Sequence, residues 1–521
     1  MAQGLFPFIC EEEKTGSGAT ALAGLPAYME LAAALGLPQA IRKCLGGCPK
    51  RQGWTDEQII MALLSLMLAG GDCVDDMEIL EKDSGFAELM RQAERNLGLD
   101  ISAEEAQRRW RKGRGRTFPS QAAVFRFLEE FHDPEQEKLR REGKAFIPQP
   151  NERLAGLVRL NRWLMAALFS AKPNKTATLD MDATLVETRK RDALWCYKGY
   201  RSYQPFNIYW AEQDVILHSE FRDGNVPAGY EQLRLLEEAL AVLPEGVEEV
   251  FVRSDTAAYQ VELLRHCAHG KNERFGVIPF AIGCDVTPAF RNAVAAVPEE
   301  DWAPLFREEG GQRYQTRQEW VEVNFAPWEL YRNRQDPPIR FIAVREALAE
   351  QPLPGLEDEL TLPFPTVALQ RAKERVIYKL HGIATNRELT GPEVITWYRQ
   401  RCGKSEEAHS ILKEDLPGGQ LPTGKFGANA AWWALVVLAS NLHSLMKHLV
   451  LEEVDGPGWE SSRMKAVRFR LMRTPGRVVR HAGQLLLRMA RGHPTLRLLI
   501  AVRREILQLA QKLKGQPAMA I

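Results

Sequence analysis

The hydrophobic positions of the chain change their period along its length. Up to about residue 135 they recur three and four apart, which is typical of amphipathic helices. Residues 55–58 have the spacing of a capping box ahead of the apolar run 59–68. Ser120 precedes a short segment in which Val124, Phe127, Leu128 and Phe131 share one face, leaving Gln121, Arg126 and Glu129 outward. The pattern predicts a helical N-terminal region.

From about residue 175 short strand-like runs alternate with helical ones. The predicted order is strand, strand, strand, helix, strand, helix, strand, over residues 176–185, 206–210, 215–221, 230–243, 250–253, 257–266 and 275–282. Strand patterns and prolines then dominate residues 286–372. This stretch is interpreted as a β-rich insertion, with a separate third domain as the alternative.

Two long helices follow a strand predicted at 375–380. The first covers about 392–414, and the second, 429–451, is apolar nearly all round. Polar Asn441, His443 and Lys447 favour a buried core helix over a membrane span. The predicted fold class is α/β, a mixed sheet flanked by helical regions. The expected divisions are 1–150 (helical), 151–285 and 373–455 (two parts of the core), 286–372 (insertion) and 456–521 (basic, helical).

Charge is balanced overall but unevenly placed. The 521 residues include 68 Lys and Arg against 68 Asp and Glu, and 45% are hydrophobic, so disorder and a globally basic binder are disfavoured. Residues 108–116 nevertheless read RRWRKGRGR, and residues 461–504 hold twelve Arg or Lys and no acid. Such runs favour a polyanionic partner, although ordinary enzymes also carry basic surface helices. The basic loop before the short helix after Ser120 resembles a helix-turn-helix reader, and a plain helical bundle has the same pattern.

Neither a signal peptide nor a long uninterrupted apolar run is present in the sequence. The expectation is a cytoplasmic protein without a membrane span, associated with the nucleoid if its partner is DNA.

Carboxylates occupy three positions suited to chemistry. Asp180 and Asp182 in TLDMDAT are two apart on one strand, so both project from one face, where they repel each other unless a cation is bound. Asp255 follows another strand, a position where α/β folds carry function, and its ordinary role would be a helix N-cap. Glu406 shares a polar helical stripe with His409 and Lys413, a pattern that a solvated helix also has.

At these residues the sequence resembles the DDE transposases of bacterial insertion sequences, which have an RNase H-like core and are distantly related to the piggyBac group. The resemblance covers about residues 170–450. It lies in the D-x-T strand with Asp182, in Asp255, and in the helix with Tyr398, Arg401, Glu406 and Lys413. Further similar motifs are Tyr197-Lys198-Gly199, Tyr203-Gln204-Pro205, Arg222-Asp223-Gly224-Asn225 and Gly403-Lys404-Ser405-Glu406.

One departure from the family signature concerns the helix. Four residues separate Arg401 from Glu406, where the family has three, whereas the six between Glu406 and Lys413 fit. Glu406 is therefore preferred over Glu407, and Asp182 over Asp180, with both neighbours left open.

The resemblance implies metal-dependent cleavage at insertion-sequence ends and strand transfer into target DNA. Asp182, Asp255 and Glu406 would hold two Mg²⁺, replaceable by Mn²⁺, about 3.5–4 Å apart beside the scissile phosphate. Tyr398, Arg401 and Lys413 would hold DNA phosphates, and Arg108, Arg109, Arg111, Lys112, Arg114 and Arg116 would add affinity that salt weakens. The expected assembly is a homodimer or a larger synaptic complex on two transposon ends.

Two other functions remain as alternatives. Asp180-Met181-Asp182-Ala183-Thr184 matches the D-x-D-x-T opening of haloacid-dehalogenase-like phosphatases, in which the first Asp attacks phosphorus and the second is the acid/base. The other is a transposase-derived DNA-binding protein that has lost catalysis.

Overall fold

The computed structural model of the protein describes residues 18–46, 53–96, 116–331, 333, 335–349, 364–371 and 374–514. Five residues of the predicted basic cluster, from Arg108 to Arg114, lie outside these ranges. Arg116 is described, and its guanidinium pairs with Glu78 and donates to the carbonyl of Phe118 (3.4 Å).

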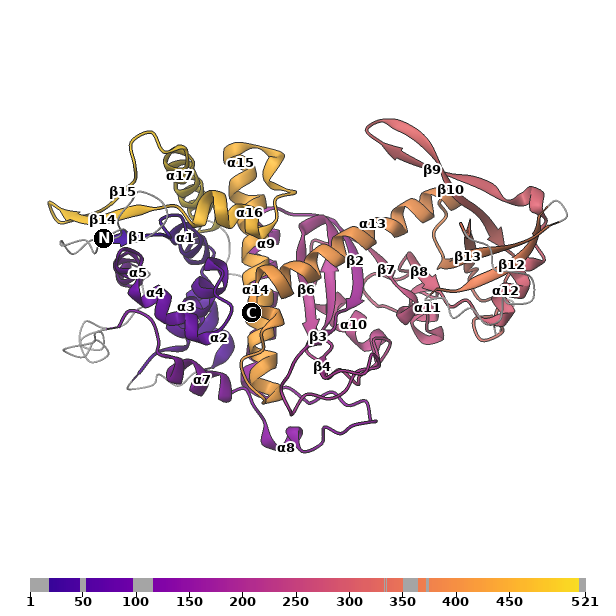
Figure 1. The fold of residues 1–521 in the computed structure, drawn as a ribbon, viewed down its shortest axis with the longest axis horizontal. Helices are drawn as coiled ribbons and strands as arrows, with labels where there is room; N and C mark the ends of the chain where they lie inside the picture. Colours follow the sequence, from indigo (N-terminus) through magenta and orange to yellow (C-terminus); the bar gives the residue numbers. More distant parts are fainter. Residues whose placement is uncertain are drawn as a thin grey trace, which may run out of the picture.

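A ten-stranded mixed sheet runs through the middle of the elongated molecule (Figure 1). Its strand order is β6-β5-β2-β7-β8-β13-β11-β10-β9, with β12 paired to β13. The bounds are β2 Thr176–Ala183, β5 Phe206–Trp210, β6 Val215–Glu220, β7 Glu249–Ser254, β8 Phe280–Cys284, β9 Ala303–Glu309, β10 Gln312–Val323, β11 Arg340–Ala347, β12 Thr366–Arg371 and β13 Glu374–Thr385. The pairs β2–β7 and β7–β8 are parallel, whereas β2–β5 and β5–β6 are antiparallel.

The predicted α/β class and the predicted element order are confirmed. Helices α10 (Gln232–Val242) and α11 (Val261–Ala268) fall where the sequence pattern places them, before and after β7. Strand β2 shows how burial follows the alternation of side chains along a strand. Ala177, Leu179 and Met181 are buried on one face, while Thr178 and Asp180 are buried on the other. Both faces of this strand are therefore covered.

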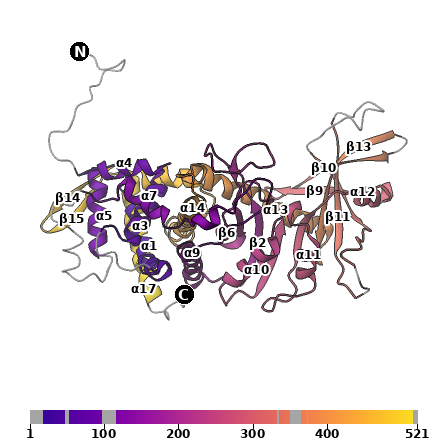
Figure 2. The same ribbon diagram turned by 90° about the horizontal axis from the view of Figure 1, so that it is seen from below.

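The insertion is built into the same sheet. β13 pairs with β8 through residues 382–385 and with β11 through residues 378–385. The strands β9 to β12 therefore extend the core sheet, and Figure 2 shows them at the end of the molecule opposite helices α1 to α5. Helix α12 (Pro288–Ala295) starts the insertion, with Thr287 capping its N-terminus.

Helices surround α14 (Phe426–Met446), which continues as a π-helical turn Lys447–Leu451. On one side it contacts β6 of the sheet, and on the other it contacts α1, α3, α7 and α9. The N-terminal elements are β1 Ala19–Thr20, α1 Pro26–Ala34, α2 Leu37–Leu45, α3 Asp56–Ala69, α4 Met77–Lys82, α5 Ser84–Asn96, α7 Gln121–Glu129, α8 Pro134–Glu137 and α9 Glu152–Ala171. These helices thus share one apolar core with the α/β part.

The predicted start of α3 is confirmed in detail. The Thr55 hydroxyl accepts a hydrogen bond from the backbone of Gln58, and the Gln58 side chain accepts one from the backbone of Thr55. Ser120 precedes α7 in the extended conformation, but its side chain does not cap the helix. Arg126 and Glu129 face outward as predicted, while Gln121 is half-buried.

The C-terminal region, predicted as basic and helical, also contains two strands, at residues 476–488. This stretch forms the hairpin β14 (Gly476–His481) and β15 (Gln484–Arg488), and β1 adds a third strand. The two-residue turn holds Ala482 and Gly483 at positive φ (48° and 77°), as a tight hairpin requires. Helices α15 (Glu452–Asp455), α16 (Met464–Val467) and α17 (Pro494–Lys514) make up the rest.

Part of the basic C-terminal charge is used inside the fold. Buried Arg468 donates to the carbonyls of Leu68 (2.8 Å) and Met67 (3.2 Å), and Arg473 donates to that of Ala69. These carbonyls lie at the C-terminal end of α3, where helical partners run out, and that of Met67 also accepts from the backbone of Gly70 (3.1 Å). Arg503 pairs with Glu30 on α1 (2.6 Å). Some of the Arg and Lys side chains between residues 461 and 504 therefore stabilise the fold, and only the others are available to a polyanionic partner.

Among the described residues, one continuous helix, Phe426–Asp455, is long and apolar enough to cross a membrane. It contains α14, and 89% of its apolar window is buried within the protein. It is the core helix that its polar residues predict.

His443 on α14 should make the protein sensitive to acid. Its Nδ1 lies 2.9 Å from the Tyr28 hydroxyl, and Lys447, Asp214, Arg468 and His448 are its charged or titratable neighbours. Burial lowers the pKa of His443 to about 3, below its unfolded value near 6.5. At a pH below the pKa of the unfolded state, His443 is protonated in the unfolded chain but stays neutral in the folded one. The free energy of unfolding therefore falls as the pH falls.

We therefore expect this residue to remove roughly 2 kcal/mol of unfolding free energy between pH 7 and about pH 5. The measurement is urea unfolding followed by tryptophan fluorescence at several pH values. His443→Gln should flatten the acid limb, whereas His481→Gln, at an exposed imidazole, should leave it unchanged. Equal slopes in the wild type and His443→Gln would contradict this assignment.

Candidate functional site

Two of the predicted carboxylates meet at the carboxyl ends of adjacent parallel strands. In the β2–β7 ladder Met181 is the partner of Ser254, so the next residues, Asp182 and Asp255, are level with each other. The Ser254 hydroxyl donates to the carbonyl of Met181 (2.9 Å) and ties the two strands together at this point. Asp255 also accepts a hydrogen bond from the backbone of Ala257 (3.0 Å), the N-cap role considered for it.

Asp180 has a different environment from Asp182. Its two oxygens accept hydrogen bonds from Nε and Nη2 of Arg253 on β7, at 2.6 and 2.8 Å. The carboxylate is 1% exposed and the guanidinium 2%. Arg253 also donates to the carbonyl of Trp397 (2.8 Å). Asp180 is thus one half of a buried, bidentate ion pair that joins β2, β7 and the helix above them.

Helix α13 (Gly391–Ser410) lies across this face of the sheet, contacting β2, β7, β8 and β10 (Figure 1). Thr390 and Glu393 form a capping box at its start. Arg401 points from it to the strand ends, where Nη1 lies 3.3 Å from Oδ2 of Asp182. Arg401 is 8% exposed, and its Nε has no hydrogen-bond partner among the described residues, nor has the buried Ser405 hydroxyl. Both donors are buried, and their hydrogen-bonding capacity is unused within the described part of the chain.

Tyr398 is buried against the sheet. Its ring lies 5.5 Å from that of His381 on β13, and its hydroxyl lies close to Gly283 on β8, where an added Cβ would come within 3.0 Å of the oxygen. Burial raises the pKa of Tyr398. Its place in the fold is beside Arg401, one turn earlier on α13.

The charges around Asp182 oppose one another. Burial raises the pKa of the Asp182 carboxyl; the Arg401 guanidinium counteracts this shift and the charge of Asp255 adds to it, and the resulting pKa is about 6. On α13, burial together with the charges of Lys413 and Arg401 lowers the pKa of His409 to about 4. The site therefore combines a carboxylate that is costly to ionise with a positive helix face.

Lys413 reaches the same region from the π-helical segment Ile411–Asp415 that extends α13. Its Nζ lies 3.4 Å from the carbonyl of Leu185, just beyond β2. Burial and the charge of Lys198 lower the pKa of Lys413, while Glu414 and Asp182 raise it. The charges of Asp182 and Lys198 thus both act on Lys413.

The third predicted carboxylate, Glu406, is not grouped with Asp182 and Asp255 in the structure. Glu406 is exposed on α13, about one and a half turns after Arg401. Its neighbour Glu407 lines a separate cavity of about 390 Å³ together with Tyr209 and Asp214. In the part of the chain that the structure describes, no group of three or more His, Cys, Asp or Glu side chains is placed to hold a metal ion. The role of Glu406 stays a prediction.

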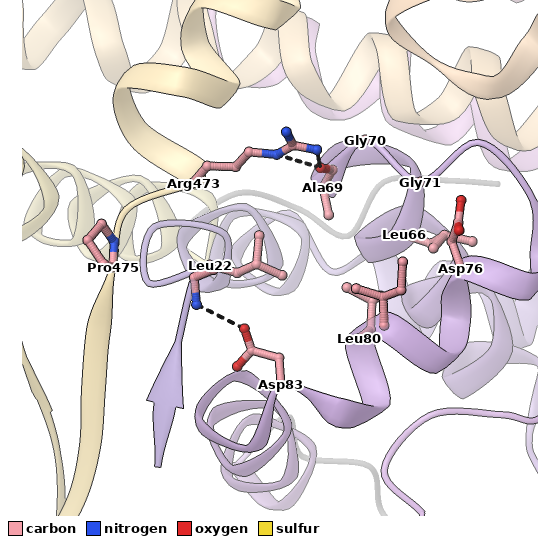
Figure 3. Close-up of a pocket in the computed structure, with 12 residues that line it drawn as sticks. Leu22, Leu66, Ala69, Gly70, Gly71, Asp76, Leu80, Asp83, Arg473 and Pro475 are labelled. Atoms are coloured by element: carbon pink, nitrogen blue, oxygen red, sulfur yellow. Dashed lines mark hydrogen bonds between the residues drawn. The ribbon is translucent and has the colours of Figure 1, made fainter. Parts of the chain in front are cut away.

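A further cavity of about 520 Å³ lies in the N-terminal region (Figure 3). It is lined largely by apolar residues of α3, α4 and the segment after β1, such as Leu22, Leu66 and Leu80. At its rim Arg473 donates to the carbonyl of Ala69, and Asp83 accepts from the backbone of Ala21. None of its lining residues comes from β2, β7 or α13, so it is separate from the strand-end carboxylates.

The role of Arg253 could not be read from the sequence. The run VFVR before Asp255 predicts a buried strand, but only the β2–β7 register shows that this arginine faces Asp180. A hint was available in the basic residue inside an otherwise apolar strand, since a buried guanidinium needs a carboxylate partner.

The phosphatase alternative requires Asp180 to attack phosphorus. Both oxygens of Asp180 are engaged by Arg253 and the carboxylate is buried, so a substrate could not reach it.

Comparison with known proteins identifies the family. The family model described as transposase DDE domain group 1 matches residues 10–335 and 367–511. Among solved structures, the piggyBac transposase synaptic complex with hairpin DNA, determined by cryo-EM, is 11% identical, with a TM-score of 0.42 over 95% of this chain and 82% of that chain. No curated protein matches the chain.

The family model spans most of the sequence, including both strand-end carboxylates and all of α13. The chain therefore belongs to the DDE transposases of domain group 1, and its activity is DNA transposition.

Proposed function

We propose that Asp182, Asp255 and Glu406 are the catalytic carboxylates with which this transposase cleaves the ends of an insertion sequence and joins them to target DNA. The observation that supports this best is the pairing of Asp182 with Asp255 at adjacent parallel strand ends, beneath Arg401 of α13. Reactive groups of α/β folds occupy this edge of a sheet.

The donor set suits a hard divalent cation. Carboxylate oxygens are the ligands that Mg²⁺ and Mn²⁺ prefer, and a bound cation would relieve the repulsion between Asp182 and Asp255 that contributes to the raised pKa of Asp182. In the proposal these two residues, with Glu406, hold two Mg²⁺. Bound there, the ions would stabilise charge on the attacking and leaving oxygens of the phosphodiester.

The cationic face of α13 would position the DNA. Nη1 of Arg401 lies 3.3 Å from Asp182, and Lys413 is half-buried beside Leu185, so both are placed to bind phosphate oxygens at the cleavage site. Tyr398 is too buried for broad contact with DNA, and its part in the proposal is to support Arg401, whose guanidinium carbon lies 5.8 Å from the centre of the tyrosine ring.

The remaining DNA affinity is assigned to the basic cluster Arg108, Arg109, Arg111, Lys112, Arg114 and Arg116. The piggyBac structure is a synaptic complex with DNA, and we propose that this chain likewise acts as a dimer or larger assembly on two DNA ends. Both ends must be held together before they are joined to one target.

The test is cleavage of a plasmid that carries the DNA flanking this gene. Wild-type protein with Mg²⁺ or Mn²⁺ should nick or excise at the borders of the element, and chelation by EDTA should stop the reaction. Cleavage at full rate in EDTA would contradict the metal-dependent mechanism. Binding without cleavage under all metal conditions would favour the alternative of an inactive DNA-binding descendant.

The same assay separates Glu406 from Glu407. Glu406→Gln should lower cleavage by about a thousandfold or more, because a metal ligand is lost, whereas Glu407→Gln should stay near the wild-type rate. The two side chains are adjacent and both exposed, so each variant is a matched control for the other. Loss of cleavage in Glu407→Gln with retention in Glu406→Gln would reassign the third carboxylate.

A further inference from the structure

The loop after β2 combines exposed aromatic rings with unpaired cations. Residues 188–201 connect β3 (Val186–Glu187) to β4 (Ser202–Tyr203), which pair as a two-stranded ribbon. Trp195 is 49% exposed and Tyr197 is 78% exposed. Two exposed aromatic rings lie close together on this one loop, where their faces are available to stack with a ligand.

The cations of this loop are oriented onto the rings. The guanidinium of Arg201 lies 5.3 Å from the centre of the Trp195 ring, and Nζ of Lys198 lies 5.8 Å from that of Tyr197. The loop also carries Arg189, Lys190 and Arg191, against the single acid Asp192. Over the described part of the chain, none of these five cations has a carboxylate within salt-bridge distance. Their charge is available to phosphates.

The loop is held in place at its base. Arg140, itself buried, donates to the carbonyl of Asp192 (2.9 Å), and Glu142 accepts from the backbone of Trp195 (3.2 Å). Arg201 donates to the carbonyl of Arg191 (2.6 Å). A turn from Cys196 to Gly199, closed by a backbone hydrogen bond of 3.0 Å, presents Tyr197 and Lys198 at the tip. The rings are thus pre-positioned, which lowers the entropy cost of binding.

The base of the loop lies beside the proposed cleavage site. Nζ of Lys413 lies 3.4 Å from the carbonyl of Leu185, the residue just before β3, and the charges of both Lys198 and Asp182 act on Lys413. A DNA strand whose phosphate lies between Asp182 and Lys413 would carry its neighbouring nucleotides toward Tyr197. A paired base presents only its edge, whereas an unpaired base presents the face that stacks on an aromatic ring.

We propose that Tyr197 and Trp195 form a stacking platform for an unpaired DNA base next to the scissile phosphate, with Lys198 and Arg201 holding the adjoining phosphates. This inference rests on the proposed function for its location, but it assigns a separate binding site. Its ligand is single-stranded or locally unpaired DNA, and duplex DNA should use the platform little.

The experiment compares a short single-stranded oligodeoxynucleotide carrying one 2-aminopurine with its fully paired duplex, bound to the full-length protein in EDTA. Tyr197→Ala and Trp195→Ala should weaken single-strand binding on the order of tenfold and lessen the quenching of 2-aminopurine, while duplex affinity changes less than about twofold. Tyr197→Phe should behave as wild type, because phenylalanine keeps the stacking face.

Trp328→Ala, at another exposed aromatic side chain (72%), is the matched control and should change neither affinity. Tyr197 is at the exposed tip of the loop, so loss of the fold is not expected, and thermal melting of the variant checks this. Equal losses for single strand and duplex, or unchanged single-strand binding in both alanine variants, would overturn the platform.

The two proposals can fail separately. Asp182→Asn should still bind and quench the single strand, because it leaves the platform intact. Full cleavage by Asp182→Asn together with lost quenching in Tyr197→Ala would refute the catalytic assignment and retain the platform.

Discussion

Asp182→Asn and Asp255→Asn are each expected to reduce DNA cleavage by about a thousandfold or more, without a comparable loss of DNA binding. Both substitutions keep the shape of the side chain and remove the negative charge that a divalent cation requires. The two residues are level on neighbouring strands, so the double variant should be barely worse than either single one.

Cleavage and binding are measured separately, on plasmid with Mg²⁺ and by mobility shift in EDTA. Asp301→Asn, at an exposed residue just before β9 and away from the strand-end carboxylates, is the control and should keep the wild-type cleavage rate. Wild-type cleavage in Asp182→Asn or Asp255→Asn would remove that residue from the catalytic set. A parallel loss of binding would indicate a damaged fold instead.

Arg253→Met is expected to destabilise the protein by about 3–5 kcal/mol, because it leaves the buried carboxylate of Asp180 without a partner. Asp180→Leu should destabilise by a similar amount for the converse reason. The double variant Asp180→Leu with Arg253→Met should recover much of the loss, since two apolar side chains then replace the ion pair.

Denaturant unfolding measures these changes. Lys175→Met breaks the exposed pair of Lys175 with Glu248 and should leave the unfolding midpoint in place. If Asp180 were instead a metal ligand, Asp180→Asn would abolish cleavage with the fold retained and Arg253→Met would have little effect on stability. Additive losses in the double variant would also contradict a direct pair.

The sequence predicted those features that depend on local periodicity. The order β2, β5, β6, α10, β7, α11, β8 followed from alternating and helical patterns, and the capping box at Thr55 followed from spacing alone. Asp182 and Asp255 were singled out by their places on and after two predicted strands and by the resemblance to DDE transposases, and their catalytic role stays a prediction.

Features that depend on pairing between distant segments were not accessible in this way. Nothing local to β13 reveals that its last residues pair with β8, so the sequence could not show that the β-rich insertion continues the core sheet. The hairpin at 476–488 was missed because basic side chains masked its alternation, and the Ala482-Gly483 turn is a weaker signal than Asn-Gly. The distinct environments of Asp180 and Asp182, two residues apart, likewise follow from Arg253 on another strand.

The central position of α14 bears on how such a protein can be divided. Its flanks are supplied by α1, α3, α7 and α9 from the start of the chain, and Arg468 from near the end closes onto α3. Removing the first hundred or so residues would expose a wide apolar surface on α14. The remainder would therefore not fold as an independent nuclease. Chimeras of related proteins should therefore fold when they exchange loops or the outer strands β9 and β10. They should fail to fold when the whole N-terminal helical segment is exchanged.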